Sequence, residues 1–152
     1  MIKVALIGAG KMGISHLAIL GAHPEVEVVG VVDPSNLITD VLNKYSPFPC
    51  FSDMPTMLEK ANPDAVLVAV PTKYHADLVW KLLEKGKHVF VEKPFCLNMD
   101  DGAYLVALAA EKNVVNQVGY HNKFLGTFNE AKELVENGTI GNLLHFTGDM
   151  NG

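Results

Sequence analysis

Two residues of opposite charge, Glu92 and Lys93, stand side by side directly after the apolar run 89–91. Such a run is typical of a buried strand, and Pro94 prevents further strand pairing behind the two charges. A lysine ammonium at such a place can stabilise developing negative charge on oxygen or assist proton transfer. A solvated ion pair at a strand end is the alternative, so the interpretation depends on what else lies at the same edge.

Three glycines with the spacing GxGxxG, Gly8, Gly10 and Gly13, lie between an apolar run and a helical pattern. Gly8 permits a tight turn, Gly10 lets the backbone approach a pyrophosphate, and Gly13 allows close packing of the helix. The start of that helix, which includes Lys11 and Met12, supplies free amides and partial positive charge. Because the same pattern also occurs in structural loops and in methyltransferases, a second signal is needed.

Asp33 provides the second signal. It lies 20 residues beyond Gly13, at the end of the apolar run 25–33. A carboxylate at this position can accept hydrogen bonds from both hydroxyls of an adenosine ribose. It would also repel a 2′-phosphate, and the chain contains no arginine that could bind one. The pattern predicts dinucleotide binding and favours NAD over NADP.

Further polar residues follow the apolar run 64–70, which continues as "PTKYH". In an open α/β sheet, ligands bind beyond the carboxyl ends of the strands. We therefore predict four residues on the same side of the sheet as the glycine turn, namely Val70, Pro71, Thr72 and His75. From its position alone, His75 could equally be a surface or capping histidine. The Glu-Lys pair is predicted to face this cleft, with Glu92 near the cofactor ribose and Lys93 near the nicotinamide.

The elements that would position these residues alternate regularly. Apolar runs predict strands at 2–8, 25–33, 47–51, 64–70, 88–92 and 114–120. Helical spacing of apolar residues lies between them, with Ser35 and Asn98 as predicted N-caps. Six strands alternating with helices predict an α/β fold with a doubly wound parallel sheet.

Composition excludes several other classes of protein. The chain has 152 residues, 49% of them hydrophobic, and a formal net charge of −5 with scattered basic residues. Neither a nucleic-acid partner nor a membrane span is expected, and the absence of a signal-peptide pattern predicts a cytoplasmic location. Cys50 and Cys96 lie far apart without zinc-ligand spacing, which predicts two reduced thiols and no metal site.

The last part of the chain has a different pattern. After Tyr120, apolar residues at helical spacing (Phe124, Phe128, Ala131 and Val135) predict a helix, and alternation at 143–150 predicts a strand. A lone strand would expose an unpaired edge. We therefore expect a dinucleotide-binding domain at 1–120, and at 121–152 the beginning of an incomplete second domain. His121 and Asn122, which follow the sixth predicted strand, are expected to contact substrate or nicotinamide.

The chain contains five short motifs in a fixed order, "GAGKMG", "VVD", "VPTKYH", "EKP" and "VGYHNKF". Their order and spacing resemble those of the glucose-fructose oxidoreductase, inositol dehydrogenase and rhizopine-catabolism family (Gfo/Idh/MocA). The resemblance covers essentially the whole chain. It implies a Rossmann domain that binds NAD or NADP, and a C-terminal α/β domain that holds the substrate and forms a homo-oligomer interface. It further implies that Lys93 is catalytic, that Glu92, Pro71 and His75 lie around the cofactor, and that the substrate is a sugar, a cyclitol or a sugar derivative oxidised at a hydroxyl.

Two departures from the family pattern stand out. Lys123 occupies a position where the family commonly has arginine, and the family's C-terminal aspartate and histidine, four residues apart, have no counterpart here. The resemblance therefore implies that this chain alone is inactive. Two alternatives remain, a dinucleotide-binding sensor or interaction module without catalysis and a methyltransferase that uses the same glycine turn. Lys93 after the fifth strand favours the oxidoreductase over both.

Overall fold

The computed structural model of the chain describes residues 1–149. The chain divides after Gly119 into two compact units. The first unit contains one sheet with strands β1 (Ile2–Ile7), β2 (Val26–Val32), β3 (Cys50–Phe51), β4 (Ala65–Val68), β5 (His88–Val91) and β6 (Asn116–Val118).

All neighbouring strands of this sheet pair in parallel, in the order β3-β2-β1-β4-β5-β6. This is the strand order of the doubly wound Rossmann fold, which confirms the predicted fold class. Each predicted strand is present but shorter than its apolar run, and β3 keeps only two residues. The runs include residues that lead into and out of the sheet, which apolarity alone does not separate from the paired residues.

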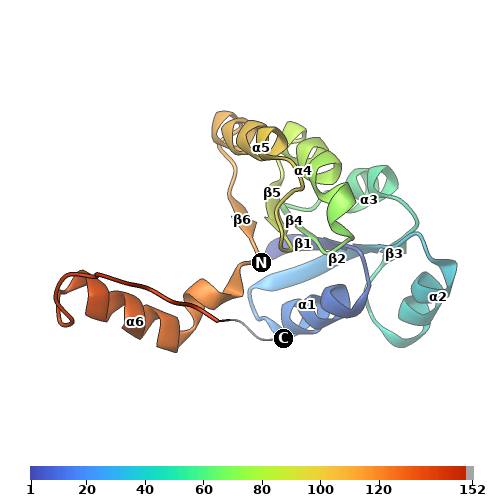
Figure 1. Ribbon diagram of the computed structural model, residues 1–152. Coiled ribbons are helices and arrows are strands. Elements are labelled where there is room, and N and C mark those ends of the chain that lie inside the picture. Colours follow the sequence, from blue (N-terminus) through green and yellow to red (C-terminus); the bar gives the residue numbers. More distant parts are fainter. Residues whose placement is uncertain (150–152) are drawn as a thin grey trace. The chain divides into compact units, whose positions relative to one another are not determined.

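The helices of this unit are α1 (Lys11–Ala22), α2 (Asn36–Tyr45), α3 (Met54–Ala61), α4 (His75–Glu84) and α5 (Met99–Glu111), with a 3₁₀ turn η1 (Thr72–Tyr74) before α4. Figure 1 shows α3, α4 and α5 over one face of the sheet and α1 over the other. Within residues 1–149, no helix combines the length and the apolar character that a bilayer crossing requires.

Apolar side chains of successive strand residues form a hydrophobic core on each face of the sheet. In β1, Ala5 and Ile7 pack with residues of α3, α4 and α5, whereas Leu6 packs with Leu17 of α1. Side chains of successive strand residues point to opposite faces, so a continuous apolar run can fill both layers. The buried sheet thus holds the ends of its strands, where the polar residues lie, in fixed relative positions.

Two helix caps stabilise the loops at the sheet's edge. The Asp53 carboxylate accepts a hydrogen bond from the Thr56 amide at 2.8 Å, and the Asn98 side chain accepts one from the Asp100 amide at 2.9 Å. Ser35 occupies the N-cap position of α2, but its hydroxyl makes no capping bond, so that part of the sequence prediction is wrong. Its amide instead donates to Asp33.

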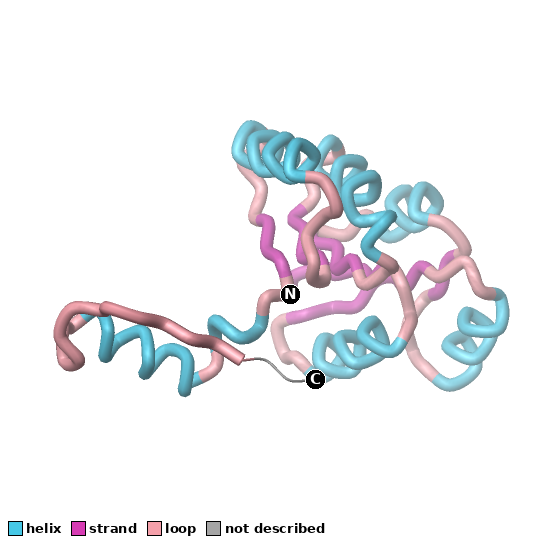
Figure 2. Tube along the Cα trace, viewed as in Figure 1, coloured by secondary structure: helices cyan, strands magenta, loops and turns pink. Residues whose placement is uncertain are grey.

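The second unit begins at Tyr120 and contains the 3₁₀ turn η2 (His121–Phe124) and helix α6 (Gly126–Glu136), as the apolar spacing predicted. The predicted strand is wrong for residues 143–149, which form neither helix nor strand, and Met150 lies outside the described residues. Figure 2 shows this segment as a loop after α6. A strand exists only when its backbone pairs with a neighbour, and the described part of this unit offers none.

Candidate functional site

The loops that leave β1, β2, β4 and β5 all emerge at the carboxyl edge of the parallel sheet. The chain moves from β1 to β2 and β3 on one side, and from β4 to β5 and β6 on the other. The strand order therefore reverses between β1 and β4, which pair directly. In open α/β sheets this switch point is where ligands bind.

The glycine loop after β1 has the geometry that its three glycines require. Gly8 has φ of +94°, and a Cβ there would lie 2.5 Å from the carbonyl oxygen of Ala69. A Cβ on Gly13 would overlap the carbonyl oxygen of Gly8, so α1 packs directly against the loop. Gly10 differs from both, because a Cβ there would meet nothing within 4 Å. The loop is closed on its inner side and open at Gly10.

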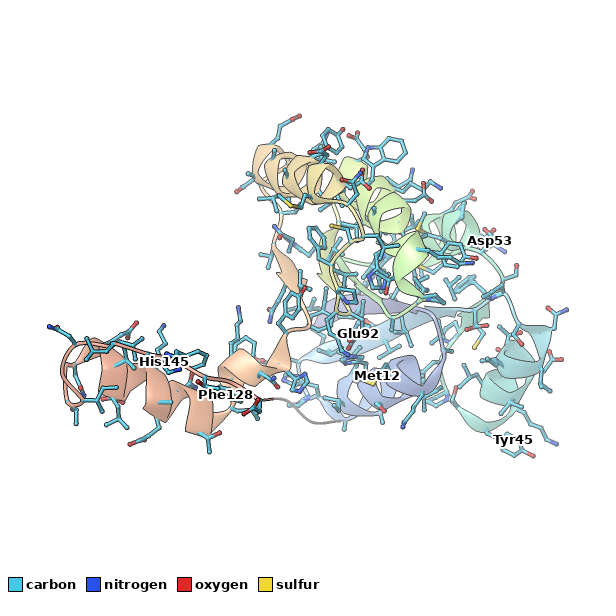
Figure 3. All side chains as sticks on the ribbon, viewed as in Figure 1. Met12, Tyr45, Asp53, Glu92, Phe128 and His145 are labelled. Atoms are coloured by element: carbon cyan, nitrogen blue, oxygen red, sulfur yellow. The ribbon has the colours of Figure 1, made fainter. Side chains whose placement is uncertain are left out.

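Helix α1 begins beside this opening without a capping side chain, because Gly10 occupies the N-cap position. Helices α3 and α5, by contrast, begin with Asp53 and Asn98 bonded to their first-turn amides. Lys11 and Met12 are exposed in the first turn of α1, and Figure 3 labels Met12 there. Uncapped amides and the helix dipole together favour an anion such as a phosphate group.

Asp33 lies directly after β2 and is 8% exposed. Its Oδ2 accepts a hydrogen bond from the Ala9 amide of the glycine loop at 2.9 Å, and its Oδ1 accepts one from the Ser35 amide at 2.9 Å. Each carboxylate oxygen has a second lone pair, so both can accept another hydrogen bond. The bond to Ala9 was not predictable from the sequence, since motif spacing places Asp33 near a ribose but gives no backbone partner.

Val70, Pro71 and Thr72 follow β4 and lead into α4, whose first residue is His75. The His75 side chain is only 1% exposed. Its Nε2 lies 2.8 Å from the Val70 carbonyl oxygen and its Nδ1 lies 2.9 Å from the Pro94 carbonyl oxygen. His75 is therefore not a surface histidine, and its ring is buried between two loops at the carboxyl edge of the sheet. Its place beside a cofactor stays a prediction.

Glu92 and Lys93 follow β5, as predicted. The Glu92 carboxylate is largely buried and its Oε1 lies 2.7 Å from Nε2 of His16 on α1. Its Oε2 accepts a hydrogen bond from the Lys93 amide at 3.2 Å. Lys93 itself is exposed and forms no ion pair within residues 1–149. Figure 3 shows Glu92 beside α1.

His16 was absent from the predicted site residues. The sequence offers one weak signal, its position three residues after Gly13 on the same helix. Its partner lies 76 positions away, however, and helical spacing cannot reveal a contact at that separation.

The remaining predicted residues, His121 and Asn122, belong to η2 in the second unit. His121 is exposed and Asn122 is partly exposed, and the Asn122 carbonyl accepts a hydrogen bond from the Leu125 amide at 3.1 Å. Their expected contact with substrate or nicotinamide stays a prediction.

A groove of about 480 Å³ lies outside this set of residues. It runs between α4 and α5 and is lined by Lys73, Asp77, Trp80, Asp101 and Tyr104, among others. It includes neither the glycine loop nor Asp33 nor the Glu92–Lys93 turn. This groove is therefore separate from the switch-point edge at which the sequence predicts the dinucleotide.

Two of the characterised proteins with similar sequences are inositol dehydrogenases. The chain is 29% identical over 149 residues to scyllo-inositol 2-dehydrogenase (NAD(+)) of Bacillus subtilis, covering 97% of this chain and 44% of the relative. It is 31% identical over 140 residues to myo-inositol 2-dehydrogenase of Thermotoga maritima, covering 91% and 42%. The chain thus spans less than half the length of these relatives.

A solved structure with the same fold is scyllo-inositol dehydrogenase from Lactobacillus casei, determined with bound NAD(H) and scyllo-inositol. The two match with a TM-score of 0.85 and 27% sequence identity, over 93% of this chain and 43% of the other. The profile of one sequence family, described as an oxidoreductase family with an NAD-binding Rossmann fold, matches residues 2–120. The chain therefore belongs to this family, Gfo/Idh/MocA, as its five motifs predicted.

Proposed function

We propose that this chain is the cofactor-binding portion of an NAD-dependent oxidoreductase that transfers a hydride between a nicotinamide and a hydroxyl-bearing carbon of a sugar, cyclitol or sugar derivative. The observation that carries the proposal is the convergence of an open glycine loop, a ribose-type carboxylate and a lysine turn at one sheet edge. The inositol dehydrogenases that resemble the chain support the substrate class.

The glycine loop fits the pyrophosphate of a dinucleotide. The open side of Gly10 and the uncapped start of α1 lie together, so backbone amides can reach phosphate oxygens without steric hindrance. Asp33 fits the adenosine ribose, because its two oxygens keep one lone pair each after bonding Ala9 and Ser35. Its negative charge disfavours the 2′-phosphate of NADP.

The Glu92–Lys93 turn fits the reacting end. A bound nicotinamide supplies the hydride chemistry. The Lys93 ammonium is free to bind the substrate oxygen and to stabilise negative charge on it while a general base accepts the hydroxyl proton. Glu92, held by His16, would orient the nearby ribose. We also propose that residues 121–152 belong to a second, substrate-binding and oligomer-forming domain, because large apolar side chains such as Leu144 (94% exposed) and Phe146 (79% exposed) lack cover.

Gly10 allows a direct test, because its substitution separates binding from folding. Gly10→Ala adds a methyl group into open space, so the melting temperature should stay unchanged. NADH binding, followed by nucleotide fluorescence, should weaken by roughly tenfold or more, because the methyl group occupies the space that the pyrophosphate must approach.

Gly126→Ala is the matched control, since a Cβ at Gly126 also meets nothing within 4 Å, and it should leave NADH binding intact. Unchanged NADH affinity in the Gly10→Ala protein would overturn the proposed cofactor site.

A further inference from the structure

Lys93 lies between two residues that are each bonded by a histidine from a different helix. On one side, His16 of α1 bonds the Glu92 carboxylate at 2.7 Å. On the other side, His75 of α4 bonds the Pro94 carbonyl at 2.9 Å. The Lys93 side chain itself is exposed, so its position depends on how firmly its neighbours hold the turn.

The His16–Glu92 pair is well shielded for a pair at a sheet edge. The side chains are 21% and 12% exposed, and the His16 ring packs edge-on against Phe90 with 5.4 Å between ring centroids. The second oxygen of Glu92 accepts a hydrogen bond from the Lys93 amide. Glu92 thus links α1, the helix of the glycine loop, to the backbone of Lys93.

His75 makes the second link. Both atoms that its ring nitrogens approach, the carbonyl oxygens of Val70 and Pro94, are acceptors only. A neutral ring can therefore donate to one of them at a time, whereas an imidazolium donates to both. The buried ring lies between the loop after β4 and the turn after β5, with one ring nitrogen within hydrogen-bond distance of each.

We infer that His16 and His75 are positioning residues for Lys93, which hold the turn from opposite sides and do not themselves touch the reacting atoms. The inference rests on the proposed function, in which Lys93 binds the substrate oxygen. It adds that the glycine-loop helix and the helix after β4 together determine where the ammonium lies.

The inference can be tested on the chain as it is, without substrate. Reductive methylation with ¹³C-formaldehyde gives each lysine an NMR signal and keeps its charge, and Lys93→Arg identifies the signal of Lys93. We expect this signal to shift in His16→Leu, which removes the bond that holds Glu92 beside the Lys93 backbone.

His75 offers a matched pair of variants. The side-chain amide of His75→Asn can replace Nδ1 and keep the bond to Pro94, whereas that of His75→Gln can replace Nε2 and keep only the bond to Val70. We expect the Lys93 signal to be retained in His75→Asn and displaced in His75→Gln. Likewise, His16→Gln should return the Lys93 signal to the position that it loses in His16→Leu. Because each comparison is between two folded variants of the same residue, a general loss of stability cannot produce the pattern.

Cofactor binding provides the second readout. His16→Leu should weaken NADH binding about fivefold, because Glu92, proposed to orient the cofactor ribose, loses one hydrogen bond. His75→Gln, which acts on the turn through Pro94, should change NADH affinity as little as Lys93→Ala does. His23→Ala changes an exposed histidine beyond the end of α1 and should leave both the Lys93 signal and the NADH affinity unchanged. If the Lys93 signal is the same in all histidine variants, the positioning role is wrong. If the variants move that signal but NADH does not affect it in the methylated chain without substitutions, the positioning role holds and the proposed place of Lys93 near the nicotinamide is wrong.

Discussion

At the scale of single residues, Asp33 joins two tasks, because the carboxylate proposed to bind a ribose also holds the Ala9 amide of the glycine loop. We predict that the chain binds NADH more tightly than NADPH, since the 2′-phosphate would approach this carboxylate closely. Titration with both nucleotides measures the preference, and equal or reversed affinities would contradict it.

Changing Asp33→Ser together with a basic substitution nearby should shift the preference toward NADPH. Asp33→Asn is a useful control, because an amide oxygen can still accept one of the two backbone bonds while the charge is removed.

Lys93 carries the second prediction at this scale. In a protein that includes the second domain proposed above, Lys93→Ala should lower turnover by on the order of 10² or more, because a positioned electrostatic or proton-transfer group is lost. NADH affinity should change little, since the pyrophosphate and adenosine contacts lie elsewhere. Steady-state rates at saturating cofactor measure the effect. If turnover survives while NADH affinity collapses, Lys93 is a cofactor anchor.

At the scale of helices and strands, the sequence predicted most of what forms in the first unit. Continuous apolar runs identified the strands, and the glycine spacing and Asp33 located the switch-point edge, because such motifs depend on local backbone geometry. Contacts between distant elements were not predictable. The pair His16–Glu92 and the bridge made by His75 depend on which helix packs beside which strand end. The expected strand at 143–149 is absent because alternation shows a capacity for pairing and supplies no partner.

Helix α3 allows a prediction of pH dependence. The Thr56 amide and then the Thr56 hydroxyl donate to Asp53 and hold the pKa of this exposed carboxyl below its usual value. Its cap therefore stabilises the folded chain above the pKa of the unfolded carboxyl, and this contribution is lost as the pH falls through the folded value. At neutral pH, Asp53→Ala should lower the melting temperature by about 3 °C.

The difference in melting temperature between the unsubstituted chain and Asp53→Ala should shrink in acid, which thermal unfolding at several pH values would show. Asp53→Asn keeps a capping oxygen without the titration, so its melting temperature should differ from that of Asp53→Ala even at low pH. If Asp53→Ala lowers the melting temperature by the same amount at every pH, the ionised Asp53 carboxylate is not the source of the stabilisation.

At the scale of the whole molecule, the two units should differ in stability. The first has buried cores on both sheet faces, whereas residues 143–149 have no strand partner. We predict that the chain folds its first unit, binds NADH and lacks dehydrogenase activity with sugars or cyclitols. In hydrogen exchange at dilute concentration, amides of the parallel strands should be protected and those of 143–149 should exchange rapidly. Strong protection of 143–149, or substrate-dependent NADH formation, would contradict this division.

The parallel sheet has a further consequence for how quickly a dinucleotide arrives. Each of the helices α1 to α5 follows a parallel strand, so all of them begin at the carboxyl edge and direct the positive ends of their dipoles there. The chain as a whole carries a net charge of −5. We therefore expect the net charge to repel a dianionic nucleotide at long range and the helix dipoles to attract it only at short range. Salt screens charges beyond about 8–10 Å most effectively. The association rate of NADH should accordingly rise between low and physiological ionic strength, which stopped-flow fluorescence can measure, and this is the opposite of what a basic binding surface would produce.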